Sequence, residues 1–334
     1  MKEKITLPPV VFGTSCLGNL YEALPYQTKL AIVKECVTNA AGDVVIFDSA
    51  GKYGAGLALE MLGTCLSEIG VPVDKVVISN KLGWIRTPLV GEEPTFEKGV
   101  WKDLKYDAVQ KISYDGIIEC YHQGNELLGK YEAQMVSVHD PDEYLAAATD
   151  EADKEKRYAD ILEAYRALND LKEDGKVSSV GIGSKDWKVI ERISKDVDLD
   201  WVMIANSLTL HSHPKALFDF IDTLHKKGVE VINSAVFNGG FLIGSDYYNY
   251  KLVDKTTSKG KALYDWREDF FTLCDKFSIK PAEACFSYGF KIPGVVAVAL
   301  NTTKPDKIKL NVSMATKTIP EAFWEAMVKE GLIS

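Results

Sequence analysis

The chain has 334 residues, a formal net charge of −9, a hydrophobic fraction of 46% and a charged fraction of 26%. These values are typical of a globular protein, and they exclude a mostly disordered chain, a collagen-like fibre and a disulfide mini-scaffold. The acidic balance, with no cluster of basic residues, also argues against binding to the phosphate backbone of nucleic acids.

Short apolar runs rich in valine and isoleucine predict strands that are buried on both faces, because each run is continuous rather than alternating. In chain order they are Val10–Ser15, Val44–Ser49, Val76–Leu82, Met135–Asp140, Val177–Ser184, Trp201–Asn206, Val229–Ala235 and Val295–Leu300. Segments with helical periodicity lie between them. These are Gln27–Ala40, Ala58–Ile69, Asp107–Leu128, Tyr158–Lys172, Asp186–Val197, Pro214–Lys227, Lys261–Phe277 and Pro281–Phe290.

Strands that alternate with helices predict an α/β protein with a parallel sheet, and eight strands are the number that closes a (β/α)8 TIM barrel. The alternative is an open, doubly wound sheet, but the glycine fingerprint that it needs is missing after the first strand, at Ser15–Leu20. No linker or repeat is visible, so we expect one domain over residues 1–334. Three long loops, Gly83–Tyr106, Pro141–Arg157 and Asn238–Gly260, follow strands three, four and seven. In a barrel they rise from the active-site face.

The cysteines and the apolar runs bear on the compartment. None of the six cysteines forms a C-x-x-C pair or a zinc-ligand spacing, so we expect free thiols in a reducing compartment. No signal peptide is visible, and no apolar run approaches the roughly 18 residues of a membrane span. These features predict a cytoplasmic protein that does not bind membranes.

Polar residues at the ends of neighbouring strands are the candidates for catalysis. Asp48 and Tyr53 follow strand two, Lys81 ends strand three and His139 ends strand four. A nearby ammonium lowers the pKa of a tyrosine, a carboxylate keeps the lysine charged, and a histidine can orient a carbonyl or alcohol oxygen. Each residue alone is more often a packing, capping or surface residue. Together they favour a general acid–base site for a carbonyl/alcohol pair.

These motifs resemble the aldo/keto reductase family. The pattern F-D-[ST]-A-x-x-Y-G stands at Phe47–Gly54, and Lys81 and His139 match the lysine and histidine that the family places after strands three and four. The resemblance implies a TIM barrel, an extended NAD(P) cofactor, and hydride transfer with Tyr53 as the general acid or base. Asp48, Lys81 and His139 complete the catalytic set that it implies.

The resemblance also implies where the cofactor binds. Asn311 matches an asparagine that contacts adenine, and Lys307 falls near the adenosine ribose. The other expected cofactor residues are Gly13, Thr14, Ser184, Asn206, Ser234, Phe237, Asn301, Thr302 and Thr303. Gly183, Met203 and Ser234 replace the residues that usually bind the carboxamide and the nicotinamide ring, so Ser184, Asn206 and Ser234 are expected to supply hydrogen bonds instead. No arginine for a 2′-phosphate follows strand eight, which slightly favours NAD over NADP, although Lys304 or Lys307 could serve NADP.

Within the family, three segments are similar to the aldose 1-dehydrogenases, which oxidise a cyclic hemiacetal to a lactone. These are Gly13–Tyr21, His139–Asp142 and Val236–Gly240. The resemblance implies a small neutral sugar or carbonyl substrate. Trp84 and Trp101 could pack on a sugar face, although ordinary loop packing explains them equally well, and Asp140 could accept hydroxyl hydrogen bonds.

Other functions stay open at this point. The same residues would serve an NADPH-dependent reductase of aldehydes or ketones, and some barrels of this kind are non-catalytic cofactor-binding subunits. The pair His211 and His213 has the form of a metal site, but no third histidine ends strand one or strand eight, so we expect no metal. For the quaternary state, we expect a monomer or a weak homo-oligomer.

Overall fold

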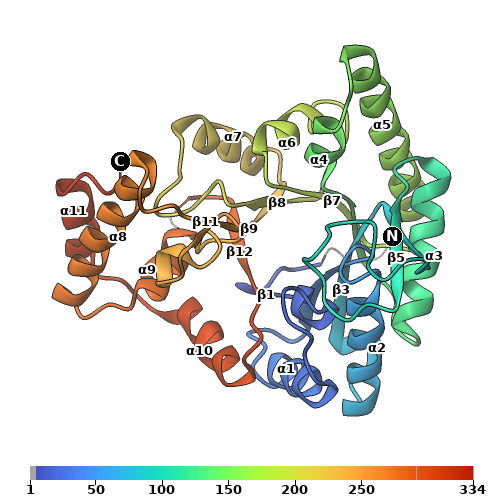
Figure 1. Cartoon of the computed structure of the whole chain (residues 1–334), viewed down its shortest axis with the longest axis horizontal. Helices are drawn as coiled ribbons and strands as arrows, with labels where there is room; N and C mark the ends of the chain where they lie inside the picture. The colour runs from blue at the N-terminus through green and yellow to red at the C-terminus, as the bar shows by residue number, and fades with distance from the viewer. Residues whose placement is uncertain (1–4, 291, 334) are drawn as a thin grey trace.

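In the computed structural model, which describes residues 5–290 and 292–333, eight parallel strands close into a barrel (Figure 1). In their order around the barrel the strands are β1 (Val10–Gly13), β2 (Val45–Ala50), β3 (Val76–Leu82), β6 (Met135–His139), β7 (Ser179–Ser184), β8 (Trp201–Ala205), β9 (Glu230–Ser234) and β12 (Val295–Leu300). The eight strands expected from the apolar runs are these eight barrel strands, so the expected (β/α)8 barrel is confirmed.

Apolar side chains fill the barrel interior beneath the carboxyl ends of the strands. Val11, Ile46, Met135 and Trp201 belong to one buried cluster, and each comes from a different strand. Trp201 fits because β7 has a glycine beside it, since a Cβ on Gly181 would lie 2.2 Å from the indole ring. The interior is therefore packed, and any site must lie at the strand ends.

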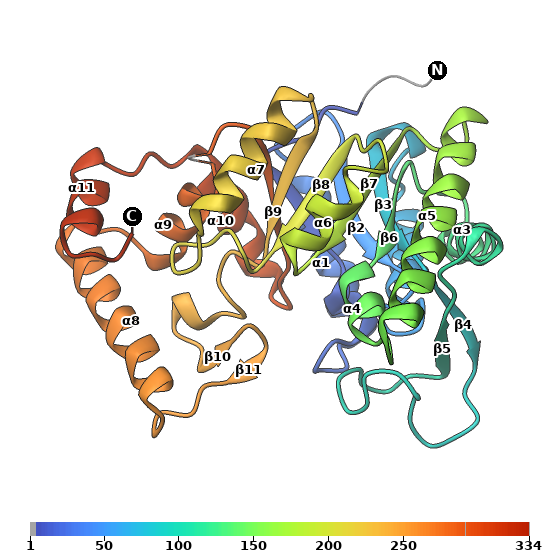
Figure 2. The same ribbon diagram turned by 90° about the horizontal axis from the view of Figure 1, so that it is seen from above.

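Helices surround the barrel (Figure 1). They are α1 (Tyr26–Thr38), α2 (Leu57–Ile69), α3 (Tyr114–Leu128), α4 (Pro141–Ala146), α5 (Glu151–Glu173), α6 (Trp187–Ile193), α7 (Lys215–Lys226), α8 (Ser258–Lys276), α9 (Pro281–Tyr288), α10 (Ile308–Ser313) and α11 (Glu321–Lys329). Figure 2 shows α8 and α11 together at one end of the molecule, where they share a buried apolar cluster with α9. None of the helices in the described part of the chain has the length and hydrophobicity of a membrane span.

The helix expected over Asp107–Leu128 is wrong at its start. Residues Tyr106–Gln110 form strand β5, which pairs antiparallel with β4 (Trp84–Pro88). The helix begins only at Tyr114, where the Ser113 hydroxyl caps it by accepting a hydrogen bond from the Gly116 N–H at 3.1 Å. The pairing with β4 decides the conformation of this segment against its helical periodicity.

The long loop expected at Pro141–Arg157 is also wrong, because most of it is helical. Pro141 occupies the first turn of α4, and α5 begins already at Glu151. The Asp150 carboxylate caps α5 by accepting a hydrogen bond from the Asp153 N–H at 2.8 Å.

The segments after β3 and β9 form much of the active-site face. The β4–β5 hairpin and the two short strands β10 (Tyr247–Tyr248) and β11 (Lys251–Leu252) project from the same side of the barrel (Figure 2). The segment Asn238–Gly260 also contains a short 3-10 turn at Phe241–Ile243. The six cysteines are buried free thiols, as expected.

Candidate active site

The carboxyl ends of the barrel strands open into a cavity of about 470 Å³. Its lining includes all four candidate catalytic residues, Asp48, Tyr53, Lys81 and His139. Two of the three candidate substrate contacts, Trp101 and Asp140, also line it. So do six candidate cofactor residues: Gly13, Thr14, Ser184, Ser234, Phe237 and Asn301. Residues from both ends of the chain therefore meet in one cavity.

Asp48 and Lys81 form a buried ion pair between neighbouring strands. The Lys81 Nζ lies 2.5 Å from one oxygen of the Asp48 carboxylate, and the Ser79 hydroxyl donates to the other oxygen at 3.1 Å. Both side chains are at most 6% exposed. Burial alone would lower the pKa of Lys81, but Asp48 and Tyr53 together outweigh this and raise the pKa. Lys81 is therefore a fixed positive charge.

Tyr53 lies against both this lysine and the histidine. The Lys81 Nζ is 4.9 Å from the centre of the tyrosine ring, and the His139 ring lies nearly perpendicular to it at a centroid distance of 5.5 Å. Burial raises the pKa of Tyr53 to about 12, although the Lys81 ammonium acts to lower it. The expected effect of the lysine on the phenol has the right sign, but burial is the larger effect, and the phenol is protonated near neutral pH.

The turn that carries Tyr53 depends on a close crossing of two chain segments. A Cβ on Gly54 would lie 2.3 Å from the carbonyl oxygen of Gly18, and a Cβ on Gly18 would lie 2.8 Å from the Tyr53 backbone. Gly54 also has a φ of 61°. Only glycine meets both conditions, which gives the last residue of the Phe47–Gly54 motif a structural reason.

His139 is a buried, neutral histidine at the end of β6. Burial lowers its pKa to about 3, although the neighbouring Asp140 acts to raise it. The His139 Nε2 lies 3.4 Å from an Asp140 carboxylate oxygen, and the Nδ1 has no hydrogen-bond partner among residues 5–290 and 292–333. A neutral imidazole in this position can bind the oxygen of a carbonyl or an alcohol.

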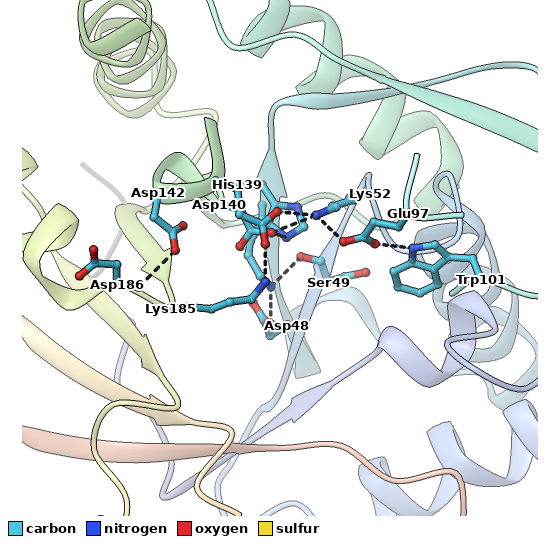
Figure 3. A network of polar contacts seen from close by, with 12 residues as sticks. Asp48, Ser49, Lys52, Glu97, Trp101, His139, Asp140, Asp142, Lys185 and Asp186 are labelled. Carbon is cyan, nitrogen blue, oxygen red and sulfur yellow. Dashed lines mark hydrogen bonds and ion pairs between the residues drawn. The ribbon is translucent and has the colours of Figure 1, made fainter. Parts of the chain in front are cut away.

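A buried lysine that sequence reasoning missed lies beside these residues. The Lys52 Nζ forms ion pairs with Glu97 at 2.8 Å and Asp140 at 3.2 Å (Figure 3). It also pairs with Glu143, at 3.1 Å. Burial alone would lower the pKa of Lys52, but the charges of Asp140 and Glu97 outweigh it and raise the pKa. The only sequence signal for this lysine was its position between two catalytic candidates, Asp48 and Tyr53. That signal was weak, because the three carboxylates that bind Lys52 lie in other segments.

The two candidate tryptophans have different environments. Trp101 lines the cavity, donates its Nε1–H to Glu97 at 2.6 Å, and packs on Tyr53 with the ring centres 5.8 Å apart. Trp84 is not among the described residues that line the cavity. Its ring packs on Phe96 at a centroid distance of 5.7 Å. Trp101 is therefore the tryptophan that a substrate could contact.

The remaining cofactor candidates extend the site toward β12 and α10. Thr302 and Asn311 line a small hollow that shares Gly13 and Asn301 with the main cavity. The Asn301 side chain is fixed by a hydrogen bond from its Nδ2 to the Ser15 hydroxyl at 2.7 Å. Thr303 and Lys307 line neither space among the described residues, although they lie beside this hollow in sequence.

Asn206 is not among the described residues that line the cavity, although it directly follows Ala205, which does. The residue is 8% exposed, and its Oδ1 has no hydrogen-bond partner within the described part of the chain. A buried amide oxygen without a partner is costly, so a ligand amide that donates to it would be stabilising. The main cavity and the adjoining hollow, which share Gly13 and Asn301, together fit an extended dinucleotide.

The histidine pair that could have indicated a metal site has protein partners. The His211 Nδ1 contacts the Tyr248 hydroxyl at 2.8 Å, and the His213 Nδ1 contacts the Thr209 carbonyl oxygen at 3.0 Å. No group of three or more histidine, cysteine, aspartate or glutamate residues among those that the structure describes could hold a metal ion.

Comparisons with known proteins agree with this geometry. The sequence profile of the Aldo/keto reductase family matches residues 9–330. Pyridoxal 4-dehydrogenase of Microbacterium luteolum is 25% identical over 346 aligned positions, which cover 99% of this chain and 96% of that protein. D-threo-aldose 1-dehydrogenase of Pseudomonas sp is also 25% identical over 346 positions, which cover 98% of this chain and 95% of that protein.

Solved structures share the fold. The holo form of the aldo-keto reductase AKR11C1 from Bacillus halodurans superposes with a TM-score of 0.67 at 18% identity, covering 98% of this chain and 92% of that one. The glycerol dehydrogenase AKR11B4 from Gluconobacter oxydans also gives a TM-score of 0.67, at 16% identity, and covers 96% of this chain and 90% of that one.

Proposed function

This chain belongs to the aldo/keto reductase family of oxidoreductases, and from that premise we propose that it is a sugar 1-dehydrogenase, oxidising C1 of an aldose from a cyclic hemiacetal to a lactone. The observation that carries the proposal is the placement of Asp48, Tyr53, Lys81 and His139 on the wall of one cavity. The name of one of the two relatives, D-threo-aldose 1-dehydrogenase, supports this reaction class.

Members of the family bind a nicotinamide cofactor, which when bound would give a hydride as NAD(P)H or accept one as NAD(P)+. We propose that Ser184, Ser234 and Asn206 bind the carboxamide end of the cofactor, and that Asn301 and Asn311 bind the adenosine end. Gly13, Thr14, Phe237, Thr302, Thr303 and Lys307 would complete its binding site. The absence of an arginine in the sequence after β12 keeps our slight preference for NAD over NADP.

The reaction needs one proton to move between substrate and protein, and Tyr53 is placed to move it. In oxidation the phenolate form of Tyr53 takes the proton of the C1 hydroxyl while the hydride leaves C1. In reduction the phenol donates the proton to the carbonyl oxygen. Lys81 stabilises the phenolate, Asp48 keeps Lys81 charged and oriented, and the neutral His139 binds the reacting oxygen. Because burial keeps Tyr53 protonated near neutral pH, oxidation should become faster as the pH rises.

The charges around the cavity favour a neutral substrate. The cavity lining contains three lysines, Lys52, Lys81 and Lys185, and three carboxylates, Asp48, Glu97 and Asp140, so its formal charges cancel. An anionic substrate would meet no net positive charge here. We propose that Trp101 packs on the sugar ring and that Asp140 accepts a hydroxyl hydrogen bond. Trp84, which packs on Phe96, is left out of this proposal.

An initial-rate screen tests the proposal. L-fucose, L-galactose, D-arabinose and pyridoxal are each supplied with NAD and with NADP, and formation of the reduced cofactor is followed by its absorbance. We expect oxidation of at least one aldose, and loss of this activity in Tyr53→Phe with cofactor binding retained. Reduction of simple aldehydes by NADPH without any sugar oxidation would instead support the alternative of an aldehyde or ketone reductase.

A further inference from the structure

Lys52 connects three segments of the active-site face through one buried ammonium. Its side chain is 4% exposed, and its Nζ pairs with carboxylates from the segment after β4 (Glu97), from the start of α4 (Asp140) and from within α4 (Glu143). Figure 3 shows the lysine between Glu97 on one side and Asp140 on the other. A lysine is seldom buried unless it is paired. The carboxylates therefore fix the position of Lys52, and Lys52 in turn fixes the positions of the carboxylates.

The first connection leads from Lys52 to Tyr53. One oxygen of the Glu97 carboxylate binds the Lys52 ammonium at 2.8 Å, and the other oxygen accepts the Trp101 Nε1–H at 2.6 Å. Trp101 is 7% exposed, and its ring lies against the Tyr53 ring with a centroid distance of 5.8 Å and a tilt of 32°. Lys52 thus holds the tryptophan that covers one side of the reacting phenol.

The second connection leads from Lys52 to His139. A single Asp140 oxygen lies 3.2 Å from the Lys52 Nζ and 3.4 Å from the His139 Nε2. Asp140 has a φ of 47°, a left-handed conformation that is unfavourable for a residue with a side chain. The ion pair with Lys52 can hold Asp140 in this left-handed conformation. The third partner, Glu143, is the most exposed of the three carboxylates, at 44%, and it also pairs with Lys185 at 2.5 Å.

We propose that Lys52 is a positioning residue for the reaction, holding Trp101 against Tyr53 through Glu97 and orienting His139 through Asp140. This inference rests on the proposed function, in which Tyr53 and His139 are the reacting groups. Lys52 acts through its two partners rather than on the substrate. Its removal disturbs both reacting groups at once, whereas the loss of either carboxylate disturbs one.

The charge of Lys52 gives this role a measurable signature. The charged and titratable groups that face His139 are Asp140 on its own segment, Lys52 and Tyr53 after β2, Lys81 on β3 and Lys185 after β7. Burial lowers the pKa of His139, Lys52 lowers it further, and Asp140 raises it. Removing Lys52 takes away a positive neighbour and leaves Asp140 with one fewer cation. The pKa of His139 should therefore rise.

Four variants separate the two connections: Lys52→Met removes both, Glu97→Gln weakens the first, Asp140→Asn weakens the second, and Glu143→Gln is the matched control. We expect Lys52→Met to lower kcat about 30-fold or more, with the dissociation constant of the cofactor unchanged within about threefold. Glu143→Gln should keep kcat within about threefold of wild type. Glu97→Gln should lower kcat in the wild-type background and have little further effect in Lys52→Met, because the connection is already broken there.

The His139 proton signals in NMR give a readout that does not need turnover. In Lys52→Met the titration of His139 should move up by about one pH unit or more, whereas in Glu143→Gln it should not move up, because that variant removes a negative charge. If Lys52→Met does not fold, the two carboxylate variants test the inference instead. In Asp140→Asn we expect a lower kcat and a lower His139 pKa, and in Glu97→Gln we expect a lower kcat. A wild type that turns over no sugar or carbonyl would refute the proposed function, while the titration would still judge the role of Lys52. The inference would be overturned if folded Lys52→Met kept the wild-type kcat and the wild-type His139 titration. It would also be overturned if Glu143→Gln and Glu97→Gln lost kcat equally.

Discussion

Replacing Asp48 by asparagine should destabilise the protein strongly, because it leaves a buried ammonium without its counter-ion. The Lys81 Nζ is 2.5 Å from the Asp48 carboxylate, and both side chains are at most 6% exposed. At an effective dielectric constant of about 20, two unit charges at this separation attract by about 6–7 kcal/mol. Part of this is recovered, because Lys81 keeps a hydrogen bond to the Ser49 carbonyl at 3.3 Å. We therefore expect a loss of about 3–5 kcal/mol in the free energy of unfolding.

Urea unfolding of Asp48→Asn and wild type measures this loss. The matched control is Asp222→Asn, which breaks the ion pair between Lys226 and Asp222, whose side chains are 72% and 56% exposed. That variant should change the free energy of unfolding by less than about 1 kcal/mol. A change below about 1 kcal/mol in Asp48→Asn as well would refute the reasoning, since the buried pair would then behave like a surface pair.

Three further predictions concern other groups. First, the rate of sugar oxidation at saturating substrate should rise from pH 7 to pH 10, by up to about tenfold per pH unit. The reason is that Tyr53 has a pKa of about 12 and oxidation needs its phenolate. A flat pH profile would argue against Tyr53 as the base. Second, His139 has a pKa of about 3 in the folded state, so only the unfolded state gains this proton below pH 6.5. This group should therefore lower the free energy of unfolding by about 1.5 kcal/mol from pH 6.5 to pH 5. Thermal unfolding of His139→Gln should lack this part of the pH dependence. An equal fall in wild type and His139→Gln would contradict the prediction. Third, Arg86→Met should lower the free energy of unfolding by about 2–3 kcal/mol. The largely buried Arg86 side chain, on β4, donates to the Ala55 carbonyl and to Glu60, both at 2.7 Å. A loss below about 0.5 kcal/mol would show that these contacts of the β4–β5 hairpin are dispensable.

Much of the barrel could be predicted from sequence because its strands are buried on both faces and appear as continuous apolar runs. The four catalytic candidates followed from the same observation, since the carboxyl ends of parallel strands meet at one face of the barrel. The segment Tyr106–Gln110 could not be placed in this way. Its strand conformation depends on pairing with Trp84–Pro88, a contact between segments that local periodicity does not report.

The ion cluster at Lys52 was beyond sequence reasoning for a similar reason. Its partners Asp140 and Glu143 lie 88 and 91 positions along the chain, so nothing near Lys52 marks it as buried. The two tryptophans show the same limit. Trp84 and Trp101 occupy the same long connection, yet only the fold determines that Trp101 reaches the cavity while Trp84 packs on Phe96.

The central claim is that Tyr53 moves the proton in a hydride-transfer reaction at this cavity. The most direct test is the single-turnover rate of cofactor reduction by an aldose that the wild type oxidises, measured in wild type and Tyr53→Phe, with cofactor affinity measured on the same samples. We predict a rate at least about 100-fold lower in Tyr53→Phe and a cofactor dissociation constant within about threefold of wild type. A Tyr53→Phe rate within about threefold of wild type would contradict the claim.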